Sequence, residues 1–489
     1  MRTILVNLLR LGGMQLVIAS TAIVRNKVLA LRLGPDGYSE FIQLSLIILT
    51  ASTIAGFGLG MSLNRNAAAA ASDEERQHLL SQANAINLGL AALLVIVLGL
   101  LTAFRPTMLT AVGLEPEPRV VVALALLLVA IPMEAAVQHR AAFLTALLDI
   151  KGMTSGRSLA LVIGTAVSVP LVWFFGLVGA AVQLTLITTL ILVFLDRRCR
   201  AIGYRPWAVA FDGTVLRTLL RFGTASLVAG FALQLSDLIV RSTLIRTTDL
   251  AQNGIYQAAL SITHQVKAIV LGSVGSYSLA TLSHDVSKDH VNRTVEQLLS
   301  IVLPIAAIAL GALGLLSGPA LIVLYSADFY PAQQVLPLLL TADYLHVMIW
   351  VVSMPLLAAG RVGVWLTFEL AFLGARFLIA LALLPTAGMV GVAAGHVLAS
   401  VLYLVLTGTY YLMVFRYALT GRNLVLFLSG GLVVVVSSWT GSRVTFDLPT
   451  YAFGTIGIAL YGLLALHIVF GFATVVRRIR ERTRGGGST

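Results

Sequence analysis

Ionisable side chains interrupt the apolar stretches of this sequence, and they are the residues whose types could do chemistry. A charge at the centre of a membrane-spanning helix costs about 2.5–3.5 kcal/mol on insertion scales, so such residues normally face water or a partner. The basic ones are Arg25, Lys27, Arg241, Lys267 and Arg376. Together they predict a cationic interior that binds an anionic ligand such as a pyrophosphate.

The spacing of these basic residues leaves their individual roles open. Arg25 and Lys27 lie about 200° apart on a helix, so they cannot easily line the same cleft. Arg25 is the stronger candidate, and the alternative for Lys27 is that it extends to the membrane surface. Arg376 either lines the cleft or pairs inside its own helix bundle. Lys267 lies near the middle of an apolar span, which favours a place in the cleft.

Three carboxylates are candidates for coupling transport to H⁺ or Na⁺, namely Glu134, Asp237 and Asp343. Asp237 also precedes Arg241 by one helical turn, so a structural ion pair is the alternative. Glu134 has Gln138 on the same helix face as a hydrogen-bond partner, and its alternative role is that of a buried neutral acid. Two further side chains, His139 and Arg140, are predicted to extend to the cytoplasmic surface.

The elements that position these residues are predicted to be transmembrane helices. The chain is 58% hydrophobic and only 11% charged, whereas soluble domains carry about 25% charged residues. Apolar runs of about 20 residues recur, which is long enough to cross a hydrocarbon core of about 30 Å. We therefore expect an all-α polytopic protein with about 14 helices, at residues 8–32, 39–64, 84–104, 119–147, 156–175, 177–196, 213–242, 250–283, 295–325, 331–360, 362–384, 388–416, 422–440 and 450–476.

The arrangement of these helices is predicted to be two lobes around a central cavity. The longest polar connection, Asp196 to Arg217, divides the first twelve helices into six and six. A weak repeat supports the division, since Leu9-Arg-Leu-Gly12 resembles Leu220-Arg-Phe-Gly223. The predicted domains are residues 1–200, residues 201–418, and residues 419–489 with two more helices and a tail. Lys and Arg near the helix ends place both termini in the cytoplasm.

Several classes of function are disfavoured by what the sequence lacks. The formal charge of +12 follows from membrane topology, so nucleic acid is not an expected partner. One cysteine, Cys199, and no Cys/His spacing predict neither a disulfide nor a metal site. None of the four lysines follows glycine, which excludes a Walker A loop for ATP. No hydrolytic motif is present, so we expect no cofactor and no enzymatic activity.

A family resemblance adds to this interpretation. The stretch Arg25 to Asn66, with Leu33-Gly-Pro-Asp-Gly-Tyr-Ser-Glu-Phe41 and Gly56-Phe-Gly-Leu-Gly-Met-Ser-Leu-Asn-Arg65, resembles the Wzx-type polysaccharide flippases. These belong to the MOP superfamily with the lipid II flippases and the MATE exporters. The resemblance implies two six-helix lobes and alternating-access flipping of undecaprenyl-pyrophosphate-linked oligosaccharide, in the bacterial inner membrane. We expect a monomer surrounded by membrane lipids.

Two other functions share this composition. A MATE-like drug or ion antiporter would favour carboxylates over arginines in its cleft. An O-antigen polymerase-type membrane enzyme would carry its catalytic residues on a long periplasmic loop, and no such loop is visible in the sequence.

Overall fold

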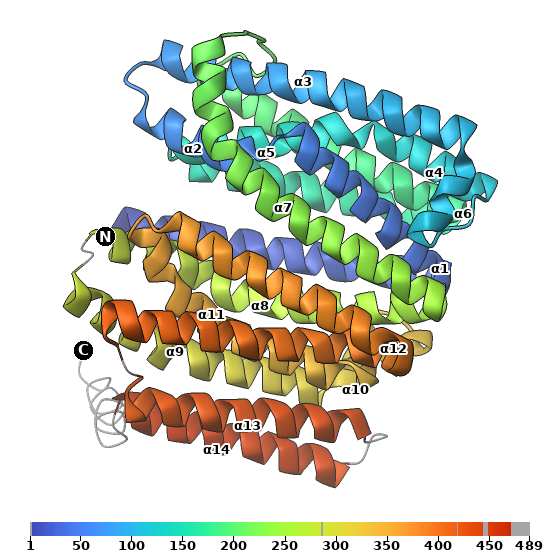
Figure 1. The fold of residues 1–489 in the computed structure, drawn as a ribbon. Helices are drawn as coiled ribbons and strands as arrows, with labels where there is room; N and C mark the ends of the chain where they lie inside the picture. The colour runs from blue at the N-terminus through green and yellow to red at the C-terminus, as the bar shows by residue number, and fades with distance from the viewer. Residues whose placement is uncertain (1, 285–286, 418, 444–447, 471–489) are drawn as a thin grey trace, which may run out of the picture. The chain divides into compact units, whose positions relative to one another are not determined.

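The computed structural model describes residues 2–284, 287–417, 419–443 and 448–470, and this part of the chain is helical without strands (Figure 1). Ten of its helices are long and apolar enough to cross a membrane. The predicted all-α polytopic class is confirmed, and each of the fourteen predicted segments overlaps an observed helix. The helices are α1 (Arg2–Ala55), α2 (Leu59–Ala69), α3 (Asp73–Phe104), α4 (Pro118–Leu128), α5 (Ala130–Ala146), α6 (Ile150–Ala201), α7 (Gly213–Thr247), α8 (Leu250–His284), α9 (Lys288–Leu315), α10 (Ser317–Leu324), α11 (Leu336–Ala358), α12 (Val362–Phe415), α13 (Gly421–Arg443) and α14 (Leu448–Phe470), with the 3-10 helices η1 (Pro106–Val112) and η2 (Ala327–Gln334).

Three of the long helices are helical hairpins that turn at a glycine. The 52 residues of α6 would extend about 78 Å as one straight helix, more than twice the hydrocarbon core. The helix is interrupted at Gly176, whose φ is +55°. Its halves run antiparallel, because a Cβ on Gly156 would lie 3.3 Å from Phe194 and one on Gly164 would lie 2.6 Å from Ile187. Equivalent breaks occur at Gly34 in α1 and Gly388 in α12.

The helix predicted at 39–64 is interrupted where the sequence reads Gly56-Phe-Gly58. Phe57 and Gly58 have φ of +49° and +62°, so α1 ends and α2 begins across this turn. A Cβ on Gly58 would lie 2.6 Å from the carbonyl oxygen of Gly223 on α7. Glycine is therefore required here both by the left-handed backbone and by the close approach of α7.

The chain forms two compact units. The first comprises Met1–Ala258, Ile322–Tyr330 and Glu369–Gly395, and the second comprises Ala259–Leu321, Pro331–Phe368 and His396–Thr489. The lobe boundaries predicted from the sequence stay a prediction. The side chains of Arg10 and Arg221 in the predicted repeat, and the C-terminal tail, lie outside the described residues.

In the first unit, a buried arginine joins three helices to a loop. Arg140 is fully buried and donates hydrogen bonds to Asp196 (3.1 Å), to Asn84 (2.6 Å) and to the carbonyl of Pro206. Its guanidinium carbon lies 4.8 Å from the ring centroid of Trp207. The prediction that Arg140 extends to the surface was therefore wrong, because the segment after α6 folds back and covers it.

The prediction that the neighbouring His139 extends to the cytoplasmic surface was also wrong. Its side chain is also buried, and Nε2 lies 3.1 Å from the carbonyl oxygen of Gly56 at the break between α1 and α2. The interruption of the helix exposes that carbonyl, which gives the histidine a partner inside the protein.

In the second unit, small residues allow helices to pack closely, as is common in membranes. A Cβ on Gly314 of α9 would lie 2.8 Å from the Cα of Ser438 on α13. The hydroxyls of Tyr344 and Tyr461 donate to the backbone carbonyl of Leu426, at 3.4 and 3.3 Å. These contacts bind α13 and α14 to α9 and α11 as parts of one unit.

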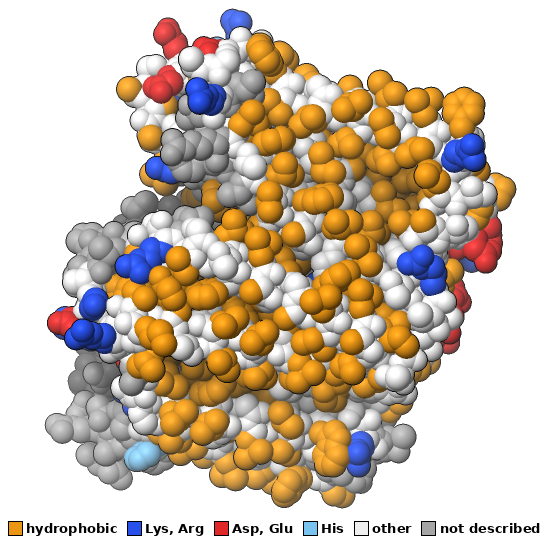
Figure 2. Space-filling view, in the orientation of Figure 1, with side chains coloured by type: hydrophobic (Ala, Val, Ile, Leu, Met, Phe, Trp, Pro, Cys, Tyr) orange, Lys and Arg blue, Asp and Glu red, His pale blue; other side chains and the backbone are white. Residues whose placement is uncertain are grey.

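The exposed surface is the one expected of a lipid-facing protein. Figure 2 shows hydrophobic side chains over the visible face, with Lys and Arg toward the helix ends. Leu93 and Ile96 of α3 are 57% and 58% exposed, and Leu432 of α13 is 63% exposed. Such broad apolar exposure is unusual for a soluble monomer and fits contact with lipid.

Candidate functional site

In the first unit, one carboxylate lies between two of the predicted arginines. Asp237 and Arg241 lie on α7, and Arg376 lies on the first half of α12. A terminal nitrogen of Arg376 forms a close ion pair with Asp237 Oδ1, whereas Arg241 Nη2 lies 3.8 Å from Asp237 Oδ2. The three side chains are 13–25% exposed. The predicted pairing of Asp237 with Arg241 is thus the weaker contact, and Arg376 is the principal partner.

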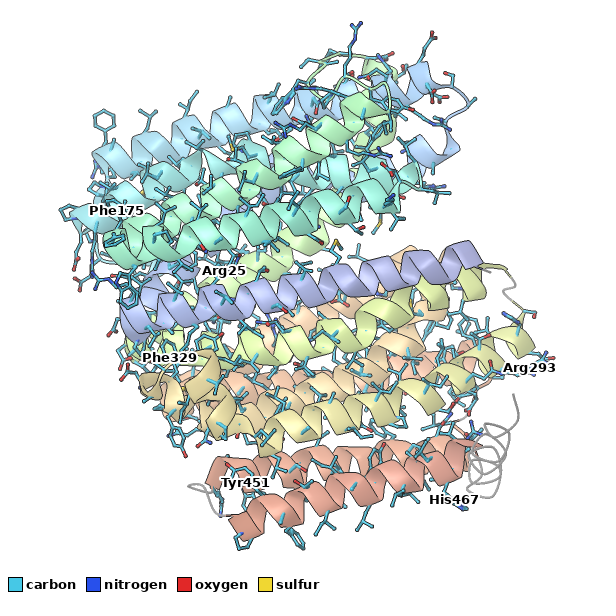
Figure 3. All side chains as sticks on the ribbon, turned by 180° about the vertical axis from the view of Figure 1, so that it is seen from behind. Arg25, Phe175, Arg293, Phe329, Tyr451 and His467 are labelled. Carbon is cyan, nitrogen blue, oxygen red and sulfur yellow. The ribbon has the colours of Figure 1, made fainter. Side chains whose placement is uncertain are left out.

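Arg25 has no acidic partner in the part of the chain that the structure describes. It lies on the first half of α1 (Figure 3), where its electrostatic neighbours are the hydroxyls of Tyr38 and Tyr325. Its side chain is partly buried. A guanidinium with five donors, no carboxylate beside it and two phenols nearby is suited to bind an anion.

Aromatic packing holds these tyrosines in place. The Tyr38 ring lies edge-on to Tyr325 and to Phe329, with centroids 5.7 and 5.6 Å apart. Asn26 also donates a hydrogen bond of 3.1 Å to the Tyr325 hydroxyl. Edge-to-face contacts of this kind stabilise a fixed arrangement of rings, so the hydroxyls near Arg25 are preorganised.

Tyr38 connects the two parts of this site. It is an electrostatic neighbour of both Arg25 and Arg241, and Arg241 is in turn repelled by Arg376. Asp237 pairs with Arg376 and Arg241 and not with Arg25, so these three arginines and one aspartate carry a net charge of +2. We call Arg25, Arg241, Arg376, Asp237 and Tyr38 the arginine cluster. It can bind a group with about two negative charges and hydrogen-bond acceptors.

The other predicted cation, Lys267, lies in the second unit. Its Nζ is 2.5 Å from Oδ1 of Asp343, whose side chain is only 1% exposed. His264 and His396 are further electrostatic neighbours of this carboxylate. Oδ2 of Asp343 has no hydrogen-bond partner among the described residues. Asp343 and Lys267 thus form a buried ion pair, and the predicted coupling role of Asp343 stays a prediction.

Two other predicted site residues, Lys27 and Glu134, form hydrogen bonds with distant segments of the chain. Lys27 donates a hydrogen bond of 2.7 Å to the carbonyl of Ile322. Glu134 accepts one of 3.3 Å from the Thr188 hydroxyl on α6, while its predicted partner Gln138 is exposed. The partner of Glu134 therefore lies on another helix, and the coupling role of Glu134 stays a prediction.

The sequence predicted several residues of the site but did not predict which of them would form ion pairs. Asp237 and Arg376 are 139 positions apart, and Lys267 and Asp343 are 76 apart. No helical spacing relates such positions. Tyr38 and Tyr325 were not predicted as site residues, although Tyr38 lies within the quoted motif and could have been noticed there.

Comparison with known proteins shows to which family this chain belongs. The model of the family described as "Polysaccharide biosynthesis protein" matches residues 4–280, more than half of the chain. This chain belongs to the polysaccharide biosynthesis protein family. It is 23% identical over 403 residues to the lipid III flippase of Escherichia coli (strain K12), which covers 79% of this chain and 93% of that protein.

Solved structures share the fold of this family member. The lipid II flippase MurJ in an inward closed conformation superposes with a TM-score of 0.71 at 15% identity, over 94% of this chain and 98% of MurJ. An inward-facing MATE family multidrug transporter gives 0.66 at 14% identity, over 84% and 99%. The predicted relationship to polysaccharide biosynthesis proteins is confirmed by the family match, and the chain is a multi-pass membrane protein with the fold of these solved structures.

Proposed function

We propose that this family member is a flippase that moves a lipid-linked oligosaccharide, carried on undecaprenyl pyrophosphate, from the cytoplasmic to the outer leaflet of the inner membrane by alternating access. The observation that carries the proposal is the excess of positive charge in the arginine cluster. A pyrophosphate supplies the two negative charges that match it, and its oxygens accept the charge-assisted hydrogen bonds that arginine donates. The relationship to a lipid III flippase supports a lipid-linked cargo.

The charge of the cargo also supplies a driving force. An inside-negative membrane potential favours the outward movement of two negative charges by about 4–5 kcal/mol per 100 mV. The Lys267–Asp343 pair offers a second route, in which uptake of a proton is exchanged for outward movement of the cargo. A cationic drug would be repelled by the arginine cluster, which disfavours the MATE-like alternative.

The test is the sidedness of a lipid-linked oligosaccharide in proteoliposomes, measured with a membrane-impermeant glycosidase. We expect the full chain to make the inner-leaflet sugar accessible, and an imposed potential to accelerate this movement. Arg105→Gln is the matched control for substitutions in the arginine cluster, since Arg105 is an exposed arginine at the end of α3. Movement that is equally fast in protein-free vesicles would overturn the proposal.

A further inference from the structure

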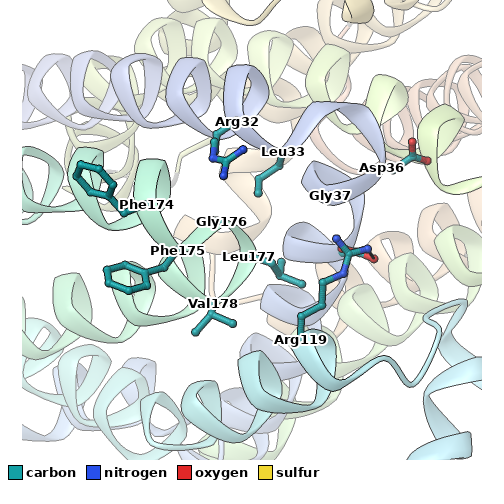
Figure 4. Close-up of a pocket in the computed structure, with 11 residues that line it drawn as sticks. Arg32, Leu33, Asp36, Gly37, Arg119, Phe174, Phe175, Gly176, Leu177 and Val178 are labelled. Atoms are coloured by element: carbon teal, nitrogen blue, oxygen red, sulfur yellow. Dashed lines mark hydrogen bonds and ion pairs between the residues drawn. The ribbon is translucent and has the colours of Figure 1, made fainter.

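A hollow lies at one end of the first unit, and none of the residues of the arginine cluster lines it. Its volume is about 390 Å³, and its walls come from the turn of α1 at Gly34, the turn of α6 at Gly176 and the start of α4. Figure 4 shows Arg32 of α1 and Arg119 of α4 reaching toward it from different sides. This size is within the range of small-ligand sites, about 300–1,000 Å³.

A buried carboxylate in its wall has an unused acceptor. Glu40 is only 4% exposed, and its Oε1 accepts a hydrogen bond of 3.1 Å from Arg119. Its Oε2 has no partner among the described residues. The other electrostatic neighbours of Glu40 are acidic, namely Asp36, Glu115 and Glu117. Because Arg119 is shared with Glu117, at 2.7 Å, the acids here outnumber their cations. A ligand with a hydrogen-bonding cation would complete this wall.

Arg32 gives the same hollow an anion-binding side. Its Nε donates to the carbonyl of Trp173 at 2.8 Å, which fixes the guanidinium. Its terminal nitrogens make no hydrogen bond in the described part of the chain, so both remain available to a phosphate. The hollow therefore carries a site for an anion and a site for a cation at the same time.

An apolar rim borders these charges. Trp173, Phe174 and Phe175 follow one another at the end of the first half of α6 and are 51%, 73% and 65% exposed; Figure 3 labels Phe175 there. Aromatic residues are enriched where a membrane protein crosses from headgroups to acyl chains. Such a rim would contact the acyl part of a lipid whose headgroup enters the hollow.

We propose that this hollow binds the headgroup of phosphatidylethanolamine, with the phosphate on Arg32 and the primary ammonium on Oε2 of Glu40. The primary ammonium is what selects the lipid. A trimethylammonium headgroup has no N–H to donate to the orphan oxygen, and a glycerol headgroup has no cation to meet the acidic wall. The site is independent of the cargo and of the arginine cluster.

Native mass spectrometry of the purified full chain tests this binding, with equal amounts of dioleoyl phosphatidylethanolamine, phosphatidylcholine and phosphatidylglycerol. We expect phosphatidylethanolamine to be retained about tenfold more than either other lipid. Glu40→Gln should remove the preference over phosphatidylcholine, and Arg32→Gln should lower retention of phosphatidylethanolamine about tenfold. Arg105→Gln, an exposed arginine outside the hollow, should change nothing.

The result that overturns the proposal is equal retention of phosphatidylethanolamine and phosphatidylcholine by the native chain, or retention of phosphatidylethanolamine by Arg32→Gln that equals that of the native chain. Arg32 is exposed and has a single backbone contact, so this variant is expected to fold even if Glu40→Gln does not. An unchanged melting temperature of Arg32→Gln confirms that the loss of lipid reflects the hollow.

Discussion

Arg25→Gln separates binding from stability, because Arg25 makes no ion pair in the described part of the chain. Glutamine keeps a polar side chain that can donate hydrogen bonds, although it is shorter, and removes the charge. A charge-assisted hydrogen bond to an anion contributes about 1.5–3 kcal/mol, which corresponds to a loss of about 10- to 150-fold in affinity for the pyrophosphate. The folded protein loses no ion pair and one charge that is costly in a membrane, so the melting temperature of Arg25→Gln should not fall below that of the native protein.

The assay is transport in proteoliposomes, combined with the melting temperature of the purified protein in detergent. Arg25→Lys keeps the charge and should recover part of the activity, although lysine lacks the two-pronged geometry of arginine. Arg105→Gln should resemble the native protein in both measurements. If Arg25→Gln transports at the native rate, or if it melts early while retaining transport, the assignment of Arg25 to the cargo is refuted.

The remaining predictions concern the acidic groups. Arg376→Gln should lower the melting temperature more than Arg25→Gln does, because it leaves Asp237 with only the 3.8 Å contact to Arg241; adding Asp237→Asn should restore part of the loss in a double-mutant cycle. Asp343→Asn cannot exchange a proton, so it should flatten the dependence of transport on a pH gradient while leaving the response to potential. The Arg198 guanidinium lowers the pKa of Asp149, which lies outside the membrane spans. The ionised Asp149 therefore stabilises the folded protein above about pH 4, and this contribution is lost as the pH falls through the lowered pKa. The melting temperature of Asp149→Asn should accordingly fall less below about pH 4 than that of the native protein.

The helices of this fold could be predicted because hydrophobic runs of membrane length are a local property. Even the turns of the hairpins could be located, since the boundaries at 32/39, 175/177 and 384/388 bracket or adjoin Gly34, Gly176 and Gly388. The break at Gly56-Phe-Gly58 could not. Within the sequence it continues an apolar run, and only the approach of α7 shows why the helix must end there.

The residues of the site could be predicted from the sequence, whereas the contacts between them could not. Membrane depth alone identified Arg25, Asp237 and Asp343, because an ionisable group in an apolar run needs an explanation. Which cation each acid would meet depends on helices brought together by the fold. The same reason explains the error at Arg140, where the partners Asp196 and Trp207 flank a loop that folds back.

The energetics of the arginine cluster favour a functional role over a structural one. Asp237 can neutralise one of the three arginines, and at about 2.5–3.5 kcal/mol each the other two cost about 5–7 kcal/mol in a membrane. That is comparable to the whole stability of many proteins. Tyr38 and Tyr325 are electrostatic neighbours of Arg25, but neither phenol carries a negative charge that would neutralise it. A ligand with two negative charges neutralises the excess positive charge of the cluster, and release of that ligand restores the excess. An empty cluster is therefore the less stable state, which gives binding and release of an anion a direct means of shifting the conformation that holds it.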